Sequence, residues 1–376
     1  MIVFTLIVFL LIFSIVVLIH EFGHFLAAKL TGVPVDEFGW GFPPRLIAKK
    51  FKGTVYSINW LPIGGFVKLR GEEFETPKSD PQSFWNKSAK VRSLVLAGGV
   101  LANILLGVVL YYIILATHGF VSAPIFLFKD YKFPFGQTQV RSTLISNVAP
   151  NSPGAQAGLV AGDLVEQVGS LKVNTAEELN AAIAGKAGQS LVLSIKNIST
   201  GVARTVNATP YFDETFRKTR FGVELSQVAF ISYDKPVDRV FSGFEHAANV
   251  IIYSGKTLGD LATLSAQTGS TAPISENVTG PVGIAGIVST VIRTSGPQLF
   301  NNLLELMALL SLALGVTNIL PIPAMDGGHL AFVAYEVITR KKPNAKFQER
   351  VNRYGFYVLI ILSLLIAFKD VKNLFR

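Results

Sequence analysis

The chain of 376 residues contains no cysteine and unusually little charge. Without cysteine there is no disulfide, and any metal site must be built from His, Asp and Glu. Only 16% of the residues are charged and 50% are hydrophobic, whereas soluble globular proteins carry about 25% charged residues. This balance predicts a membrane protein with a polar part. The net charge of +9 is explained by where the basic residues lie, so we expect no nucleic-acid partner.

The first nineteen residues carry no charged side chain. They also lack the basic start and the small-residue cleavage site of a signal peptide, so we expect a membrane-spanning helix. As a helix the run is about 28 Å long, close to the hydrocarbon thickness of a bilayer. Three further apolar segments are long enough to span, at 93–117, 303–322 and 355–368. The last is short and would need anchoring Tyr and Lys residues.

Basic residues concentrate in two connections between these segments, which predicts that both connections are cytoplasmic. Both termini and the long segment 118–302 are then extracytoplasmic. The basic residues include Arg45, Lys49, Lys50, Lys52, Lys68, Arg70, Lys78, Lys87, Lys90 and Arg92 in the first connection, and Arg340, Lys341, Lys342, Lys346, Arg350 and Arg353 in the second.

The first apolar run leads directly into His20-Glu21-Phe22-Gly23-His24. His20 and His24 are four residues apart and project from one face of a helix. His-Glu-x-x-His on a helix is the zinc-hydrolase arrangement, with two nitrogen ligands and a Glu as general base toward a water. Ionisable groups inside a membrane are costly unless they are paired and used, so this cluster predicts a functional metal site.

A catalytic zinc site usually has three protein ligands. The third must come from a similar membrane depth, and Asp326 is the strongest candidate, because the predicted topology places it toward the same cytoplasmic side as His20. It follows the third apolar segment, where prolines and glycines break the helix. His329 is the competitor, and we prefer Asp326 because mixed His/carboxylate sites suit hydrolytic zinc. The remaining histidines, His118 and His246, lack ligand spacing and are expected to be solvated or interfacial.

Residues 54–69 contain two β-rich stretches around Pro62-Ile63-Gly64-Gly65. This pattern predicts a β-hairpin with Gly64-Gly65 in the turn region. The hairpin either dips into the membrane toward the first helix, if its backbone is covered, or lies in the cytosol at the membrane surface.

The predicted extracytoplasmic segment alternates short β runs with turns over 141–210, with a helix over 176–184. Residues 151–164 closely resemble a PDZ domain, a fold that commonly binds an extended peptide at a sheet edge. Such a domain either binds a peptide C-terminus here or acts as a size filter. An amphipathic helix is expected over 238–264, at the membrane surface or packed on the module. The Gly-rich stretch 280–286 is expected to be irregular.

Taken together, these motifs resemble the site-2 protease family (M50) of intramembrane zinc metalloproteases, and within it bacterial RseP-type members. The chain has one PDZ-like sequence where some relatives have two. Substrate gating by a tandem pair of PDZ domains is therefore not implied for it. Gly99 and Met325 also depart from the residues frequent there, without evident consequence. The resemblance covers nearly the whole chain and rests on residues 20–24, 64–68, 98–103, 151–164, 280–284 and 318–329.

The resemblance implies that His20, His24 and Asp326 bind Zn²⁺ and that Glu21 is the catalytic base. The implied activity is endopeptidase cleavage of transmembrane segments in single-span membrane proteins, that is, regulated intramembrane proteolysis of substrates such as anti-sigma factors or remnant signal peptides. A membrane-associated hairpin would present the substrate. The implied substrate-binding residues are Asn318, Asn103, Gly65, Phe66 and Val67.

Two other functions compete with this interpretation. A PDZ-bearing membrane scaffold with a non-catalytic metal site has no need for Glu21 or Asp326. A metal transporter would need ionisable groups in several spans, which the second and fourth apolar segments lack.

The expected fold is a polytopic α-helical membrane protein with about four transmembrane helices, a membrane-associated β-hairpin and one extracytoplasmic α+β PDZ domain. We expect it in the bacterial inner membrane, with the lipid bilayer and single-span proteins as partners. The expected divisions are 1–30 and 93–117 for the first two spans, 31–92 for the hairpin region, 118–215 for the PDZ domain, 216–302 for the amphipathic helix and connector, 303–330 for the third span, 331–353 for a cytoplasmic loop, and 354–376 for the fourth span.

Overall fold

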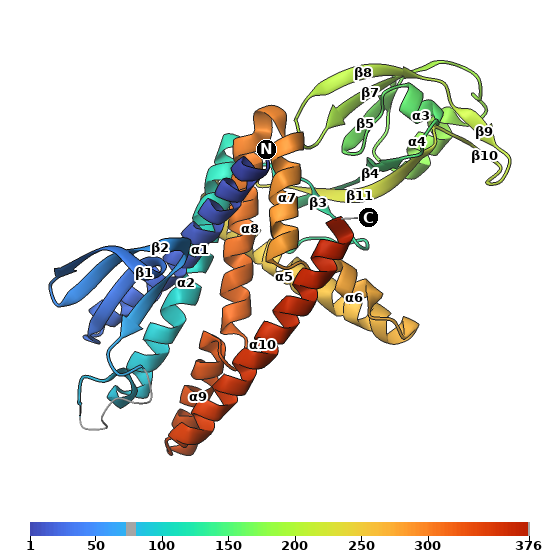
Figure 1. Cartoon of the computed structure of the whole chain (residues 1–376). Coiled ribbons are helices and arrows are strands. Elements are labelled where there is room, and N and C mark those ends of the chain that lie inside the picture. Colours follow the sequence, from blue (N-terminus) through green and yellow to red (C-terminus); the bar gives the residue numbers. More distant parts are fainter. Residues whose placement is uncertain (73–79, 375–376) are drawn as a thin grey trace. The chain divides into compact units, whose positions relative to one another are not determined.

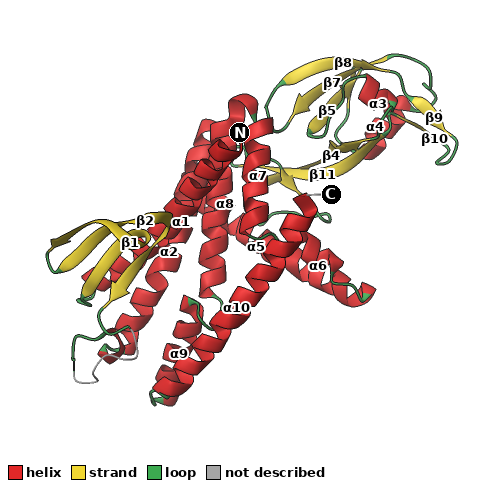
Figure 2. Cartoon of the chain, viewed as in Figure 1, coloured by secondary structure: helices red, strands yellow, loops and turns green. Residues whose placement is uncertain are grey.

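The computed structural model describes residues 1–72 and 80–374, and its elements are shown in Figures 1 and 2. The chain forms two compact units. The first contains residues 1–111, 250–290 and 304–376, and the second contains residues 112–249 and 291–303.

Within the described residues, four helices are long and apolar enough to cross a membrane, which confirms the predicted number of spans. Two of them are longer than predicted, since the second begins before residue 93 and the fourth extends well beyond 355–368. The extra turns carry the polar and charged residues that a search for apolar runs leaves out. The four helices are α1 (Ile2–Leu30), α2 (Ala89–Thr117), α8 (Leu299–Ile319) and α10 (Ala345–Leu374).

The first unit contains a sheet made from two long strands, β1 (Val35–Phe51) and β2 (Thr54–Leu69). The hairpin predicted inside 54–69 is therefore wrong. The turn lies at Lys52 and Gly53, which both have positive φ, as a two-residue turn of type I′ requires. Gly64 also has a positive φ of 70°, but it lies within β2.

Both strands bend, so one stretch of β1 is paired on two sides. Phe38 lies opposite Tyr56 on one side and Val67 on the other. The last residues of β2 therefore form the border of the sheet that contacts α1. The hydroxyl of Ser14 on α1 fixes this border, because it donates to the Pro62 carbonyl at 2.8 Å and accepts from the Gly64 N–H at 3.2 Å.

Helices α1 and α2 approach closely where Gly23 faces Gly98. A Cβ built on Gly23 would lie 2.2 Å from the Gly98 carbonyl oxygen, so a larger residue would push the helices apart. A buried apolar cluster continues this contact through Ala28, Val95 and Val333. Small residues at the crossing are the usual means of close helix packing inside a membrane.

The remaining elements of the first unit include the Gly-rich segment predicted to be irregular. That prediction is wrong, because α7 begins at Pro281, a favoured first helical residue. The Asp370 carboxylate accepts from the N–H groups of Gly280 and Gly283 at 2.9 and 3.0 Å. These elements are η1 (Phe84–Asn86), α6 (Ala272–Asn277), α7 (Pro281–Thr294) and α9 (Asp326–Thr339), together with the later part of α5 (Pro236–Thr268).

The second unit is built on a seven-stranded sheet with the path β3-β11-β4-β5-β7-β8, and β6 pairs with β5. A separate two-stranded ribbon, η2 (Gly296–Gln298), two short helices and the first part of α5, up to residue 249, also belong to it. The strands are β3 (Ile125–Phe126), β4 (Gln137–Val148), β5 (Asp163–Val168), β6 (Leu171–Lys172), β7 (Leu191–Asn197), β8 (Ala203–Ala208), β9 (Tyr211–Asp213), β10 (Lys218–Arg220) and β11 (Val223–Ser232), and the helices are α3 (Pro153–Gln156) and α4 (Ala176–Ile183).

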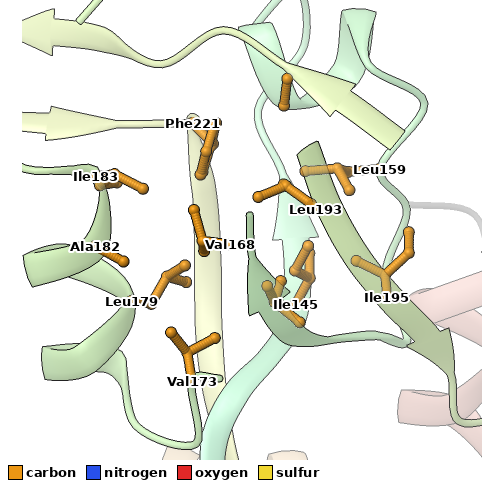
Figure 3. Packing of buried hydrophobic residues seen from close by; sticks show 12 residues of the cluster. Ile145, Leu159, Val168, Val173, Leu179, Ala182, Ile183, Leu193, Ile195 and Phe221 are labelled. Carbon is orange, nitrogen blue, oxygen red and sulfur yellow. The ribbon is translucent and has the colours of Figure 1, made fainter. Parts of the chain in front are cut away.

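The core of the second unit lies between α4 and the sheet, as Figure 3 shows. Leu179 and Ile183 on α4 and Leu193 on β7 are buried. The helix predicted over 176–184 is confirmed, and a capping box between Thr175 and Glu178 fixes its start. Burying these side chains is the main source of stability for such a module.

His246 in α5 is almost completely buried, so the expectation that it is solvated or interfacial is wrong. Its Nδ1 lies 3.1 Å from the Tyr233 hydroxyl, which also accepts from Asn249 at 3.2 Å. Burial disfavours the charged imidazole and lowers the pKa of His246 to about 4.

Acid is therefore expected to destabilise the second unit between about pH 6.5 and pH 4. In the unfolded chain His titrates near 6.5, so below that pH the unfolded state takes up a proton that folded His246 does not bind. The free energy of unfolding should fall by about 3 kcal/mol in total. The unfolding temperature of the wild type should fall as the pH is lowered through this range. It should fall less for His246→Gln, which keeps a polar partner for Tyr233. Equal slopes would contradict the assignment.

Candidate metal centre

The centre begins with two imidazoles on α1. His20 and His24 are both buried, and their Nε2 atoms lie 3.2 Å apart. The rings meet edge to face, with centroids 4.8 Å apart. The four-residue spacing on one helical face thus brings two nitrogen atoms to one point.

The third group is Asp326, the first residue of α9. Its Oδ2 lies 3.0 Å from His20 Nε2 and 3.2 Å from His24 Nε2. Within the described part of the chain, these three residues form the one group of His, Asp or Glu side chains that could hold a metal ion. His329, the competing ligand, lies outside this group.

The break between α8 and α9 puts Asp326 in place. Helix α8 ends at Ile319, and Ala324 has a positive φ of 70°. The Ala324 N–H donates to Oδ1 of Asn352 on α10 at 3.2 Å. A Cβ on Gly327 would lie 2.1 Å from the Leu320 carbonyl oxygen, so only glycine allows this tight return.

A buried ion pair fixes α9 against α2. Arg92 donates to the Glu336 carboxylate at 2.7 Å, and both side chains are largely buried. The guanidinium also lies over the ring of Trp85, 5.8 Å from its centroid. Leaving either charge without its partner inside the protein would cost several kcal/mol, so the pair holds the helix that carries Asp326.

The Nδ1 atoms of both imidazoles contact groups on α2. His24 Nδ1 lies 2.8 Å from the Val95 carbonyl oxygen, and His20 Nδ1 lies 3.3 Å from Nδ2 of Asn103. Between these contacts is Gly99, where a Cβ would lie only 2.4 Å from His24 Nε2. Sequence reasoning missed the Val95 carbonyl because a backbone group leaves no residue signature.

Glu21 follows His20 and is half-buried. Its Oε2 accepts the Val67 N–H at 3.1 Å, so the carboxylate lies at the border of β2. Gly65 is buried opposite Trp40, and Phe66 is half-buried. Strand β2 therefore brings this stretch of backbone beside the predicted base.

Asn318 lies near the end of α8. Its Nδ2 is 3.2 Å from His20 Nε2, and its side chain is half-buried. The predicted polar residue thus contacts the side of His20 that faces Asp326. Asn103, by contrast, is fully buried on the opposite ring nitrogen.

The donor set fits a zinc ion. Zinc bonds of about 2.0–2.1 Å in a tetrahedral arrangement place ligand atoms about 3.3 Å apart, close to the 3.0 to 3.2 Å between these atoms. Two imidazoles and one carboxylate also match the ligands of hydrolytic zinc sites, which leave one position open.

The fold and this site define a class of membrane protein in which four helices are long and apolar enough to cross a bilayer, and a His-His-Asp group on α1 and α9 could hold a metal ion. The model of Peptidase family M50 matches residues 8–362, and the chain belongs to that family. Its members are zinc-dependent proteases embedded in membranes, and zinc is the cofactor.

Three similar curated proteins carry names that contain the words zinc metalloprotease. One from Clostridium acetobutylicum is 31% identical over 98% of this chain and 97% of its own length. One from Clostridium perfringens is 31% identical over 96% and 97%, respectively. A relative from Mesorhizobium japonicum is 28% identical over 98% of both chains.

Proposed function

We propose that this protein is an intramembrane zinc endopeptidase that hydrolyses peptide bonds within the transmembrane segments of single-span membrane proteins. One observation carries the proposal. The group formed by His20, His24 and Asp326 lies on and beside helices long enough to span a membrane. The substrate class is that of regulated intramembrane proteolysis, such as anti-sigma factors or remnant signal peptides.

The chain's own residues supply the rest of the chemistry. His20, His24 and Asp326 would hold the zinc ion, which when bound polarises the scissile carbonyl and makes water a better nucleophile. Glu21 would take the proton of the attacking water and pass it to the leaving amine. Its Oε2 accepts the Val67 N–H of β2, which supports this role by holding the carboxylate at that strand.

A helical substrate hides its carbonyl groups in its own hydrogen bonds, so it must unwind before it is cleaved. Strand addition supplies new partners for the exposed backbone. The stretch Gly65, Phe66 and Val67 is proposed as the border to which the unwound segment adds, because it lies beside Glu21. Asn318 is proposed as a further polar contact for the substrate, near His20.

The second unit is proposed to be a PDZ domain on the extracytoplasmic side. The PDZ-like text at 151–164 and the α4-covered sheet support this assignment. The domain would either bind a peptide C-terminus or exclude substrates with bulky external domains. The distribution of basic residues supports extracytoplasmic termini and a place in the bacterial inner membrane.

Purified protein with zinc tests this function on a single-span reporter in detergent or liposomes. We expect cleavage inside the apolar segment and loss of cleavage after chelation, with recovery when zinc returns. A scaffold would bind the reporter without cutting it, and a transporter would move zinc across liposomes without cutting it. Either result would overturn the proposal.

A further inference from the structure

Asn103 lies in the middle of α2 and is fully buried. Its side-chain amide faces Nδ1 of His20 at 3.3 Å. We propose that Asn103 is a positioning residue for the metal centre, which fixes the His20 ring so that Nε2 offers its lone pair to zinc. This inference rests on the proposed zinc site but assigns a role different from substrate contact.

The requirement comes from the chemistry of imidazole. A ring that binds a metal through Nε2 carries its proton on Nδ1, and that N–H needs an acceptor. His20 Nε2 is the atom that meets Asp326 and His24 Nε2. An acceptor at Nδ1 is therefore the natural partner, and the Asn103 amide is the group that contacts this atom.

His24 shows the same arrangement with a backbone group. Its Nδ1 contacts the Val95 carbonyl oxygen at 2.8 Å, and its Nε2 also points to Asp326. Val95, Gly99 and Asn103 are spaced four residues apart, so they line one face of α2. The outer two hold one imidazole each, and Gly99 gives both rings room.

An amide suits this position because it has both an acceptor and a donor. The Oδ1 atom of Asn103 is buried and has no hydrogen-bond partner among the described residues. A half-turn of the amide brings this free acceptor to Nδ1. In the structure Nδ2 of Asn103 faces Nδ1 of His20. When Nδ1 carries the proton, Oδ1 of the turned amide accepts the hydrogen bond from this N–H group.

Packing against α8 favours this role over a contact with substrate. The Ser311 hydroxyl donates to the Asn103 carbonyl oxygen at 2.8 Å, and Gly315 lies against Asn103 Cβ. Asn103 has no exposed surface, so a substrate would have to displace His20 or α8 to reach its amide.

Zinc affinity of the full-length protein tests this role, measured by competition with a chelator of known affinity. Asn103→Leu removes both the acceptor and the donor and is expected to weaken zinc binding about 10- to 100-fold. Asn103→Asp keeps an acceptor and should bind zinc within a few-fold of the wild type. The spectrum of bound Co²⁺ should change in Asn103→Leu and stay close to the wild type in Asn103→Asp. At saturating zinc, KM for the reporter should be unchanged in both.

Ser311→Ala is the matched control, because it removes a buried hydrogen bond to the same residue without touching the imidazole. It should keep wild-type zinc affinity. If Asn103→Leu raises KM and leaves zinc affinity unchanged, the role is substrate contact and the inference is wrong. Equal zinc loss in Asn103→Leu and Asn103→Asp would also overturn it. A wild type that binds no zinc would instead refute the proposed function.

Discussion

Glu21→Gln is expected to lower the rate of reporter cleavage by about 10²- to 10⁴-fold, the usual contribution of general acid–base catalysis. Gln has the same shape and keeps an oxygen for the Val67 N–H, but its amide does not accept a proton at neutral pH. Because Glu21 is no metal ligand in this arrangement, the variant should still bind one zinc ion. Single-turnover cleavage and zinc content, measured on the same preparation, check both parts.

Glu349→Gln is a suitable control, since this side chain is 41% exposed and its ion-pair partner among the described residues is Arg353, four residues along α10. It should cleave the reporter at the wild-type rate. Unchanged cleavage by zinc-loaded Glu21→Gln would show that another group moves the proton. Membrane peptides that accumulate in cells carrying the inactive variant would reveal the natural substrates.

Asp326→Ala is expected to abolish cleavage and to weaken zinc binding by more than about 100-fold. Residues that only contact a metal ligand contribute up to about 100-fold, and loss of a ligand itself should exceed this. The change removes the carboxylate that meets both imidazoles and leaves two ligands on one helix. Equilibrium zinc binding and the Co²⁺ spectrum measure the loss directly. Added zinc should not restore wild-type activity at concentrations that saturate the wild type.

His329→Gln separates the two candidates for the third ligand. His329 lies one turn after Asp326, with Nε2 3.5 Å from Asn352 and its ring beside Trp85. The variant should still bind one zinc ion per chain, because the group that could hold the metal is His20, His24 and Asp326 and does not include the His329 ring. Zinc loss in His329→Gln together with retention in Asp326→Ala would assign the ligand to His329.

Local pattern was sufficient to predict the four helices of membrane length. Apolar runs of membrane length predict spans because an unpaired backbone is intolerable in lipid, and each of the four runs lies wholly or largely within a helix. The spacing of His20 and His24 likewise requires only the period of the helix. These features depend on neighbours in sequence.

The sheet of the first unit shows where local pattern fails. Gly64-Gly65 is the stronger turn signal when residues 54–69 are considered alone. The partner of this segment is β1, however, so the turn falls at Lys52 and Gly53 and the glycines stay inside β2. Pairing energy between whole strands outweighs the preference of two residues.

Distant partners decided two other elements. The Gly280 segment is helical because Asp370, ninety residues later in the chain, accepts the N–H groups at its start. His246 is buried because Tyr233 and Asn249 complete its polar surroundings. A buried polar group is stable only when it finds such partners, and their positions are not visible in a short stretch of sequence.

The sequence by itself determined the type of chemistry. It places two imidazoles and the Glu21 carboxylate on an apolar helix, and it places Asp326 after the apolar segment that prolines and glycines interrupt. Only the tertiary structure decided which atoms face each other. It brings Asp326 to the Nε2 atoms of His20 and His24, and it brings the border of β2 to Glu21. It also brings Val95 to Nδ1 of His24 and Asn103 to Nδ1 of His20. Residue type and spacing follow from the helical period, whereas the state of each imidazole depends on groups more than seventy residues away in the chain.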